Sequence, residues 1–178
     1  MEWFNWLTSK SNFNYFTEVN LRLNHTNPLK IKLEKSIATK YLLSCLVLFD
    51  KGIPQARLAL YLNPNHKHKG EQAASVGYFE CPKNTSYANL LLAKAEEMAG
   101  AQGAQYLIGP MNGSTWEAYR FREETRNTPF FLEPSNPSWY PSLFHNFGFE
   151  VLSEYSSYIF NQIETTPPKV HRRELQLI

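Results

Sequence analysis

Several features that commonly decide the class of a protein are scarce in this 178-residue chain. Its two cysteines, Cys45 and Cys81, each lie in or beside an apolar run, so no disulfide or zinc framework can be read from them. The longest apolar run, residues 41–49, is too short to span a bilayer as a helix. Charge of one sign is also lacking, because 18 basic and 16 acidic side chains leave a formal net charge of +2. The sequence therefore disfavours membrane and nucleic-acid partners.

The amino terminus lacks the pattern of a secretory signal. Glu2 stands where a signal peptide needs Lys or Arg, and the apolar residues that follow it are interrupted. With no disulfide framework and no membrane span indicated, we expect a cytoplasmic protein in a reducing compartment.

Aromatic residues are abundant: 12 Phe, 10 Tyr and 4 Trp make up 15% of the chain. Some of these rings are expected to line a pocket as well as a core. The length is typical of one compact domain. We predict a single domain over residues 1–178, with a core at 35–160, an N-terminal extension at 1–34 and a surface tail at 161–178.

Two strand-length apolar runs, joined by turn residues at 50–54, predict a hairpin of residues 41–49 with 55–62. Residues 73–81 and 104–110 also read as strands. Their spacing predicts a right-handed crossover and a parallel pair.

The segment between these two strands, residues 83–103, predicts a helix. Thr85 or Ser86 is expected to cap its beginning, and Gly100 or Gly103 to close its end.

The two ends of the chain carry weaker signals. Interrupted aromatic residues within 1–17 are interpreted as a short amphipathic helix, although the period is unclear. Near the other end, a short helix is expected before Gly148, followed by one or two strands within 149–160.

This order of elements resembles the GNAT superfamily of acyl-CoA-dependent N-acyltransferases. Phe147, Gly148, Phe149 and Glu150 are similar to the Gly-Phe signature in which a helix of that superfamily ends. A Gly-Pro-x-Asn-Gly-x-Thr-Trp run at 109–116 is similar to that of an uncharacterised GNAT-like group. The resemblance covers roughly residues 35–160 and implies an α/β fold, with a GNAT-like mixed central sheet flanked by helices. It also implies transfer of an acyl group from acetyl-CoA or another acyl-CoA to a small amine.

The resemblance implies that the coenzyme A pyrophosphate binds where the main helix begins. The matching segment offers Cys81, Lys83, Asn84, Thr85 and Ser86, but it lacks the paired glycines of the superfamily's loop. Asn112 is a further residue expected at the cofactor. The alternative is that Thr85 or Ser86 only caps the helix.

Glu80 is the residue expected to act as general base, and the alternative is an exposed carboxylate at the end of a strand. Phe144 stands where the superfamily often has the tyrosine that protonates the leaving thiolate. Tyr119 and Tyr140 are both candidates for that acid, and Tyr119 is preferred because it lies seven residues after Asn112. Cys81 is disfavoured as a nucleophile, since no His or Asp is evidently paired with it.

Ser114 and Glu117 form a capping-box pattern, which predicts a short helix directly after the second strand of the parallel pair. Its side chains are expected to build the acceptor pocket, with Trp116 and Tyr119 as walls and Arg120 or Arg122 holding a substrate carboxylate. Two further residues, Glu133 and Tyr140, are assigned to the same pocket. The alternative is a solvated helix with an Arg120–Glu124 pair and Trp116 packed in the core.

No metal site is predicted, because His66 and His68 lack a third ligand and read as a solvated loop. An inactive GNAT-fold module that binds a ligand or a partner is the alternative to an enzyme. The sequence leaves open whether the chain forms a homodimer.

Overall fold

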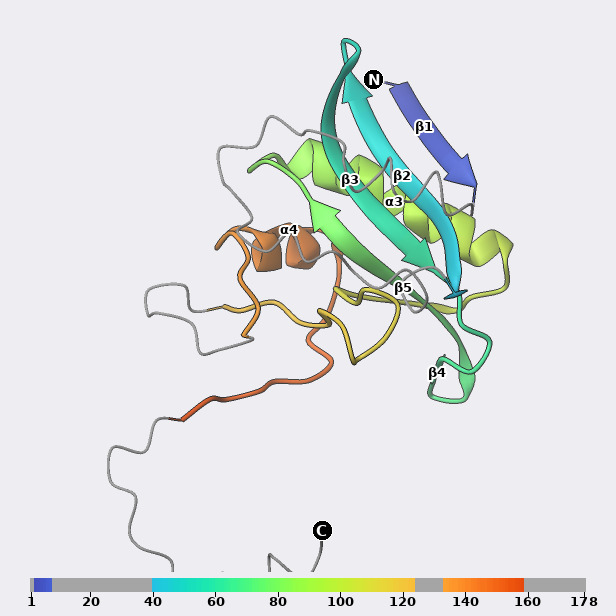
Figure 1. Cartoon of the computed structure of the whole chain (residues 1–178), viewed down its shortest axis with the longest axis vertical. Coiled ribbons are helices and arrows are strands. Elements are labelled where there is room, and N and C mark those ends of the chain that lie inside the picture. Colours follow the sequence, from blue (N-terminus) through green and yellow to red (C-terminus); the bar gives the residue numbers. More distant parts are fainter. Residues whose placement is uncertain (1, 8–39, 124–132, 159–178) are drawn as a thin grey trace, which may run out of the picture.

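The computed structural model describes residues 2–7, 40–123 and 133–158, and its centre is a six-stranded sheet (Figure 1). The strands are β1 (Glu2–Leu7), β2 (Leu42–Asp50), β3 (Ile53–Tyr61), β4 (Lys67–His68), β5 (Glu71–Glu80) and β6 (Tyr106–Ile108). Their order is β1-β2-β3-β5-β4, with β6 beside β5. Among the strand pairs of the described residues, β5–β6 is the only parallel one. The prediction of a mixed central sheet is confirmed.

The helix predicted within residues 1–17 is wrong for the part that the structure describes. Residues 2–7 form β1, which pairs antiparallel with β2 from Glu2 opposite Phe49 to Leu7 opposite Ser44. Trp and Phe favour strands, and pairing with β2 gives the backbone of residues 2–7 its hydrogen bonds. A helix would instead have needed a regular apolar period, which the sequence lacks here. Residues 8–17 lie outside the described residues.

The predicted hairpin is confirmed as β2 and β3, which run antiparallel. Lys51 and Gly52 form its two-residue turn, with positive φ angles of 51° and 73°. Two positive φ angles are the mark of a turn whose twist matches that of the flanking strands. The turn is shorter than predicted, because Ile53 and Pro54 already belong to β3.

Helix α3 (Thr85–Ala101) crosses from β5 to β6 and covers one face of the sheet (Figure 1). It buries Ala88, Leu91, Leu92, Ala95 and Ala99. The crossover and the parallel pair are confirmed.

Both ends of α3 have defined caps. The cap at the beginning is Asn84 and not Thr85 or Ser86, because the Asn84 side chain accepts a hydrogen bond from the Tyr87 N–H at 3.2 Å. At the other end Gly103 has a φ of +84°, and the Ala104 N–H donates back to Ala99, as in a Schellman motif.

Helix α4 (Tyr140–Phe147) ends at Gly148, whose φ of 115° lies in the left-handed region, as the sequence predicted. The strands predicted after it are wrong within residues 149–158, where the structure has none and where Val151, Leu152, Tyr155 and Tyr158 are exposed. A strand needs a partner, and β6 is only three residues long. This segment instead leads away from the sheet (Figure 1).

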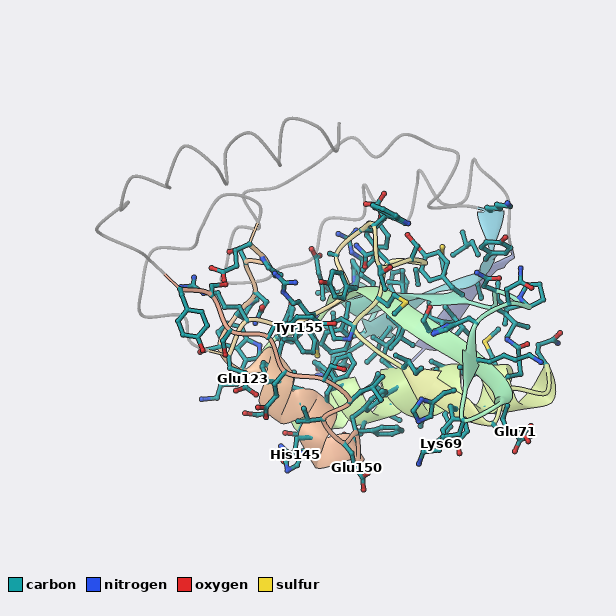
Figure 2. All side chains as sticks on the ribbon, turned by 90° about the horizontal axis from the view of Figure 1, so that it is seen from below. Lys69, Glu71, Glu123, His145, Glu150 and Tyr155 are labelled. Carbon is teal, nitrogen blue, oxygen red and sulfur yellow. The ribbon has the colours of Figure 1, made fainter. Side chains whose placement is uncertain are left out.

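Charged and polar side chains mark the outside of the molecule (Figure 2). Lys69 and Glu71 lie at the β4–β5 turn, whereas His145 and Glu150 lie at the end of α4. Within the described ranges, neither helix is long and apolar enough to cross a membrane.

Gly77→Ala is expected to lower the free energy of unfolding by about 1–3 kcal/mol, because a close-packed site cannot accept an added methyl group without strain. A Cβ at Gly77 would lie 2.5 Å from both Asn112 Oδ1 and the Met111 carbonyl oxygen. Gly100→Ala is the matched control in α3, where nothing lies within 4 Å of the new Cβ. That control is expected to stabilise the helix by up to about 1 kcal/mol. Urea denaturation of both variants measures the difference, and equal effects would contradict the close approach.

Candidate active site

A bulge near the end of β5 sets the geometry of the candidate site. Arg57 on β3 pairs with Glu80 and Ala59 pairs with Gly77, so β5 carries one extra residue between these pairs. Tyr78 lies in the bulge with a φ of +49°, a conformation that is costly for a bulky residue. After the bulge, Phe79 packs in the core beneath α3, whereas Glu80 reaches Arg57.

The segment that follows β6 continues alongside β5 as far as this bulge. The Gly109–Pro110 peptide bond is cis. The Met111 N–H donates to the Val76 carbonyl at 2.7 Å, and the Tyr78 N–H donates to Asn112 Oδ1 at 2.7 Å. Asn112, which was predicted at the cofactor, therefore satisfies the backbone of the bulge.

Glu80 forms an ion pair with Arg57. Arg57 Nη2 lies 2.8 Å from Glu80 Oε2, and the two side chains are only 12% and 16% exposed. The alternative of a solvated carboxylate is therefore wrong. Because this pair is largely desolvated, the position of the Glu80 carboxylate is fixed more firmly than that of a surface carboxylate.

The backbone of Cys81 is bound by two side chains at the beginning of α4. The Cys81 N–H donates to the Tyr140 phenol oxygen at 3.2 Å, and Trp139 Nε1–H donates to the Cys81 carbonyl at 3.2 Å. Burial raises the pKa of Tyr140 above its ordinary value, and the charge of Glu80 raises it further. Tyr140 is thus a protonated phenol close to Glu80.

An aromatic cluster holds Tyr140 in this position. It consists of Phe79, Phe121, Tyr140 and Phe144, whose rings pack edge to face with centroids 4.8–5.9 Å apart. Phe144, at the superfamily's usual tyrosine position, thus serves as core.

Tyr119 lies in different surroundings from Tyr140. The Arg120 guanidinium donates to the Tyr119 phenol oxygen at 2.6 Å and stacks 5.2 Å from the centroids of the Tyr119 and Tyr155 rings. Tyr155 belongs to the segment after α4 (Figure 2). Of the two tyrosines considered as the acid, the one placed with Glu80 is Tyr140.

The helix predicted from the Ser114 and Glu117 capping box is wrong. Residues 112–118 form a loop that is closed by a 2.8 Å hydrogen bond from the Asn112 N–H to the Ala118 carbonyl. The Ser114 hydroxyl oxygen accepts from the Trp116 N–H two residues on, which favours a turn over a helix. Trp116 is 90% exposed, so the alternative that placed it in the core is wrong as well.

Arg122 and Glu133 hold each other, with Arg122 Nε 3.7 Å from Glu133 Oε2. Glu133 also accepts a hydrogen bond from Ser157 at 3.0 Å. The Asn136 side chain accepts a hydrogen bond from the Arg122 N–H at 2.7 Å, so the segment around Arg122 is tied to the residues before α4. Glu124, the partner expected for Arg120, lies outside the described residues.

The segment at the beginning of α3 has exposed Lys83, Thr85 and Ser86. Cys81 is fully buried, and burial raises the pKa of its thiol to about 12. A thiol with that pKa is almost wholly protonated at neutral pH, which agrees with its rejection as a nucleophile.

Metal ligands do not gather at this site. The described residues contain no group of three or more His, Cys, Asp or Glu side chains that could hold a metal ion. His68 packs edge to face on Tyr106, with centroids 4.8 Å apart, and burial lowers the pKa of His66.

Comparison with solved structures shows the fold. The chain is similar to the aminoglycoside N-acetyltransferase AAC(6')-Iy, solved with a bisubstrate analogue of coenzyme A and acetylneamine: the TM-score is 0.54 and the identity 9%, over 91% of this chain and 100% of that one. A ribosomal-protein-alanine N-acetyltransferase from Brucella melitensis biovar Abortus 2308 matches with a TM-score of 0.48 and 12% identity, over 91% and 100% of the chains. No protein-family model and no curated protein matches the chain. The chain has the GNAT fold, as the resemblance implied.

Sequence reasoning missed Arg57 and Trp139. Arg57 is 23 residues before Glu80 in the sequence, and only the register of β3 on β5 brings them together. Trp139 precedes α4 in a proline-rich segment, and its contact with Cys81 depends on how α4 packs against β5. A signal for Arg57 did exist, because a charged residue in the middle of an apolar strand run usually has a partner.

Asn112→Ala is expected to lower the free energy of unfolding by about 1–3 kcal/mol, because it leaves the Tyr78 N–H without its acceptor. Asn112→Asp keeps an oxygen at that position and is the matched control, expected to retain most of the stability. Chemical denaturation of both variants tests this. If the two lost equal stability, the hydrogen bond to Tyr78 would not be what holds the segment.

Proposed function

We propose that this protein is a GNAT-type acyltransferase that moves an acyl group from acyl-CoA to a small amine. The observation that carries the proposal is the parallel β5–β6 pair bridged by α3, which begins with exposed residues just beyond the end of β5. In open α/β sheets, ligands bind outside the carboxyl ends of such strands. AAC(6')-Iy, which has this fold, was solved with a coenzyme A analogue.

The pyrophosphate end of the donor fits the beginning of α3. The first N–H groups of a helix have no partner within it, and they favour an anion. Asn84 already accepts from the Tyr87 N–H, so the N–H groups of Thr85 and Ser86 are the ones available to a phosphate. Lys83, directly before them, adds a positive charge at an exposed position.

The thioester end of the donor and the Tyr140 phenol would compete for the same backbone N–H group. An acyl group beside the end of β5 would use the Cys81 N–H, which now donates to Tyr140. Acyl-CoA binding in this orientation therefore requires the Tyr140 phenol oxygen to give up its hydrogen bond with the Cys81 N–H. The displaced Tyr140 phenol would then lie next to the thioester sulfur of acyl-CoA.

Glu80 and Tyr140, which meet at the end of β5, suit acyl transfer. The amine nitrogen attacks the thioester carbon, and Glu80 accepts the proton that the nitrogen loses. The C–S bond then breaks, and the Tyr140 phenol donates a proton to the departing thiolate. The Tyr140 phenol holds a proton at neutral pH, and because burial raises its pKa, its proton transfer to the thiolate is the demanding step. Proton return from Glu80 to Tyr140 restores both groups.

A module that has kept the fold without the chemistry is the second candidate. Its supporting observation is that Trp139 and Tyr140 occupy both the carbonyl and the N–H of Cys81. In that case the two rings form a permanent part of the core, and the protein binds a ligand or a partner elsewhere.

Thr85→Pro tests the donor site. Proline is tolerated at the first helical position, and Asn84 has the extended conformation (φ −139°, ψ 104°) that a residue before proline prefers. The variant removes one N–H donor and should weaken acetyl-CoA binding by about tenfold or more, the loss typical of a hydrogen bond to a charged group. Gly100→Ala, near the opposite end of α3, should bind as tightly as the unmodified protein.

Thermal unfolding with and without acetyl-CoA measures this binding, because a ligand of the folded state raises the melting temperature. Absence of any shift at millimolar acetyl-CoA in the unmodified protein would favour the inactive module.

Tyr140→Phe separates the two candidates. If Tyr140 is the acid, removing its oxygen should lower kcat by about 10²- to 10⁴-fold while acetyl-CoA binding persists. If Tyr140 only seals the end of β5, acetyl-CoA binding should tighten in the variant, with no turnover in either protein. Tyr106→Phe on β6 is the control, and turnover with a panel of small amines together with calorimetry gives both quantities.

A further inference from the structure

A second polar cluster lies on the face of the sheet opposite α3. Tyr61 at the end of β3 belongs to the smaller core cluster there, around Cys45 and Ala59, and Tyr78 in the β5 bulge packs against this cluster. The loop of residues 112–118 lies against this pair. A Cβ on Gly113 would be 3.1 Å from two carbons of the Tyr61 ring, and Asn112 holds the Tyr78 backbone.

Tyr61 has an unusual phenol group. The residue is only 1% exposed, and within the part of the chain that the structure describes its buried oxygen has no hydrogen-bond partner. Leaving a buried hydroxyl unpaired costs about 1–3 kcal/mol, so such groups generally have a partner in a protein's working state. An unpaired oxygen beside a polar loop is therefore a candidate contact for a ligand atom.

Glu117 brings a carboxylate to the same place. It belongs to the loop over Tyr61 and is half-buried, and this burial raises the pKa of its carboxyl group. Its charge in turn raises the pKa of both Tyr61 and Tyr78, after the larger effect of their own burial. The three groups therefore share one region of the fold, as the approach of Gly113 to the Tyr61 ring and the loop-closing hydrogen bond from Asn112 to Ala118 also indicate.

The chemistry of these groups selects a small set of ligands. A carboxylate accepts hydrogen bonds only, and a phenol oxygen accepts through its lone pairs. A primary ammonium group has three donors and one positive charge, so it can serve the carboxylate and a phenol oxygen at once. A neutral alcohol would lack the charge, and a quaternary ammonium would lack the donors.

We propose that Glu117 and the Tyr61 phenol oxygen bind the ammonium group of a primary amine, with the Tyr78 ring as a wall of the site. This inference rests on the proposed function in that it places the acceptor amine on the sheet face that carries Glu80. Amine binding is nevertheless measurable without acyl-CoA, so the two ideas can fail separately.

The experiment uses n-butylamine as the probe and the full chain without acyl-CoA. Calorimetry or thermal unfolding is expected to show saturable binding in the millimolar range. n-Butanol, which has the same apolar chain, and tetramethylammonium, which has the same charge, are expected to bind at least about tenfold more weakly, since each lacks part of the charge-assisted hydrogen bond.

Two variants assign the site. Glu117→Gln is expected to abolish the preference for butylamine over butanol. Glu123→Gln is the matched carboxylate control, because Glu123 is exposed at the end of the molecule that carries α4 (Figure 2), and it should bind as the unmodified protein does. Tyr61→Phe should weaken butylamine about tenfold while leaving the free protein at least as stable, since it removes an unpaired buried oxygen.

The outcomes decide the proposal directly. Absent or unsaturable butylamine binding, equal binding of butanol, or unchanged binding in Glu117→Gln would overturn it. A marked loss of stability in Tyr61→Phe would overturn it too, because it would mean that a buried water or another group already satisfies the phenol. If butylamine binds as expected but acetyl-CoA does not, the amine site stands and the transferase proposal fails.

Discussion

The hydrogen bond from the Tyr78 N–H to Asn112 Oδ1 is the constraint on which the arrangement of this region depends. Tyr78 holds a left-handed backbone conformation that costs on the order of 1–3 kcal/mol and persists only where its surroundings enforce it. Asn112 supplies that enforcement, and the close approach at Gly77 leaves room for it. The bond also fixes the beginning of the loop that carries Glu117. One side-chain oxygen thus couples the bulge, the path of the chain after β6 and the position of a carboxylate.

Around the bulge, the residues at the end of β5 contribute to both faces of the sheet. Toward α3, Phe79 and the backbone of Cys81 meet the aromatic cluster and the beginning of α4. On the other face, Glu80 pairs with Arg57, and Tyr78 lies beside Tyr61. Under the proposed function, a donor that enters along α3 and an acceptor that arrives from the opposite face would meet at Glu80. This geometry favours direct transfer in a ternary complex, in which positioning supplies much of the rate.

The predictions from the sequence succeeded for the elements whose structure is determined by local patterns. Turn residues between apolar runs located the β2–β3 hairpin, and the strand-helix-strand spacing located the β5–α3–β6 crossover. Predictions failed where tertiary contacts decide. Ser114 and Glu117 fit a capping box, but the Asn112–Ala118 hydrogen bond closes a loop there instead. Spacing alone also could not show that the packing of α4 brings the Tyr140 ring to Cys81. Arg57 was missed because its partner depends on strand register.

Both thiols of the chain are buried, and burial raises the pKa of each to about 12. Alkylating reagents attack the thiolate, so neither group reacts appreciably while the fold is closed. Cys45 lies within β2 and Cys81 directly follows β5. Each thiol becomes reactive only when its own part of the sheet opens. The protein therefore carries two intrinsic reporters of local unfolding, Cys45 beside Tyr61 on the face opposite α3 and Cys81 at the end of β5.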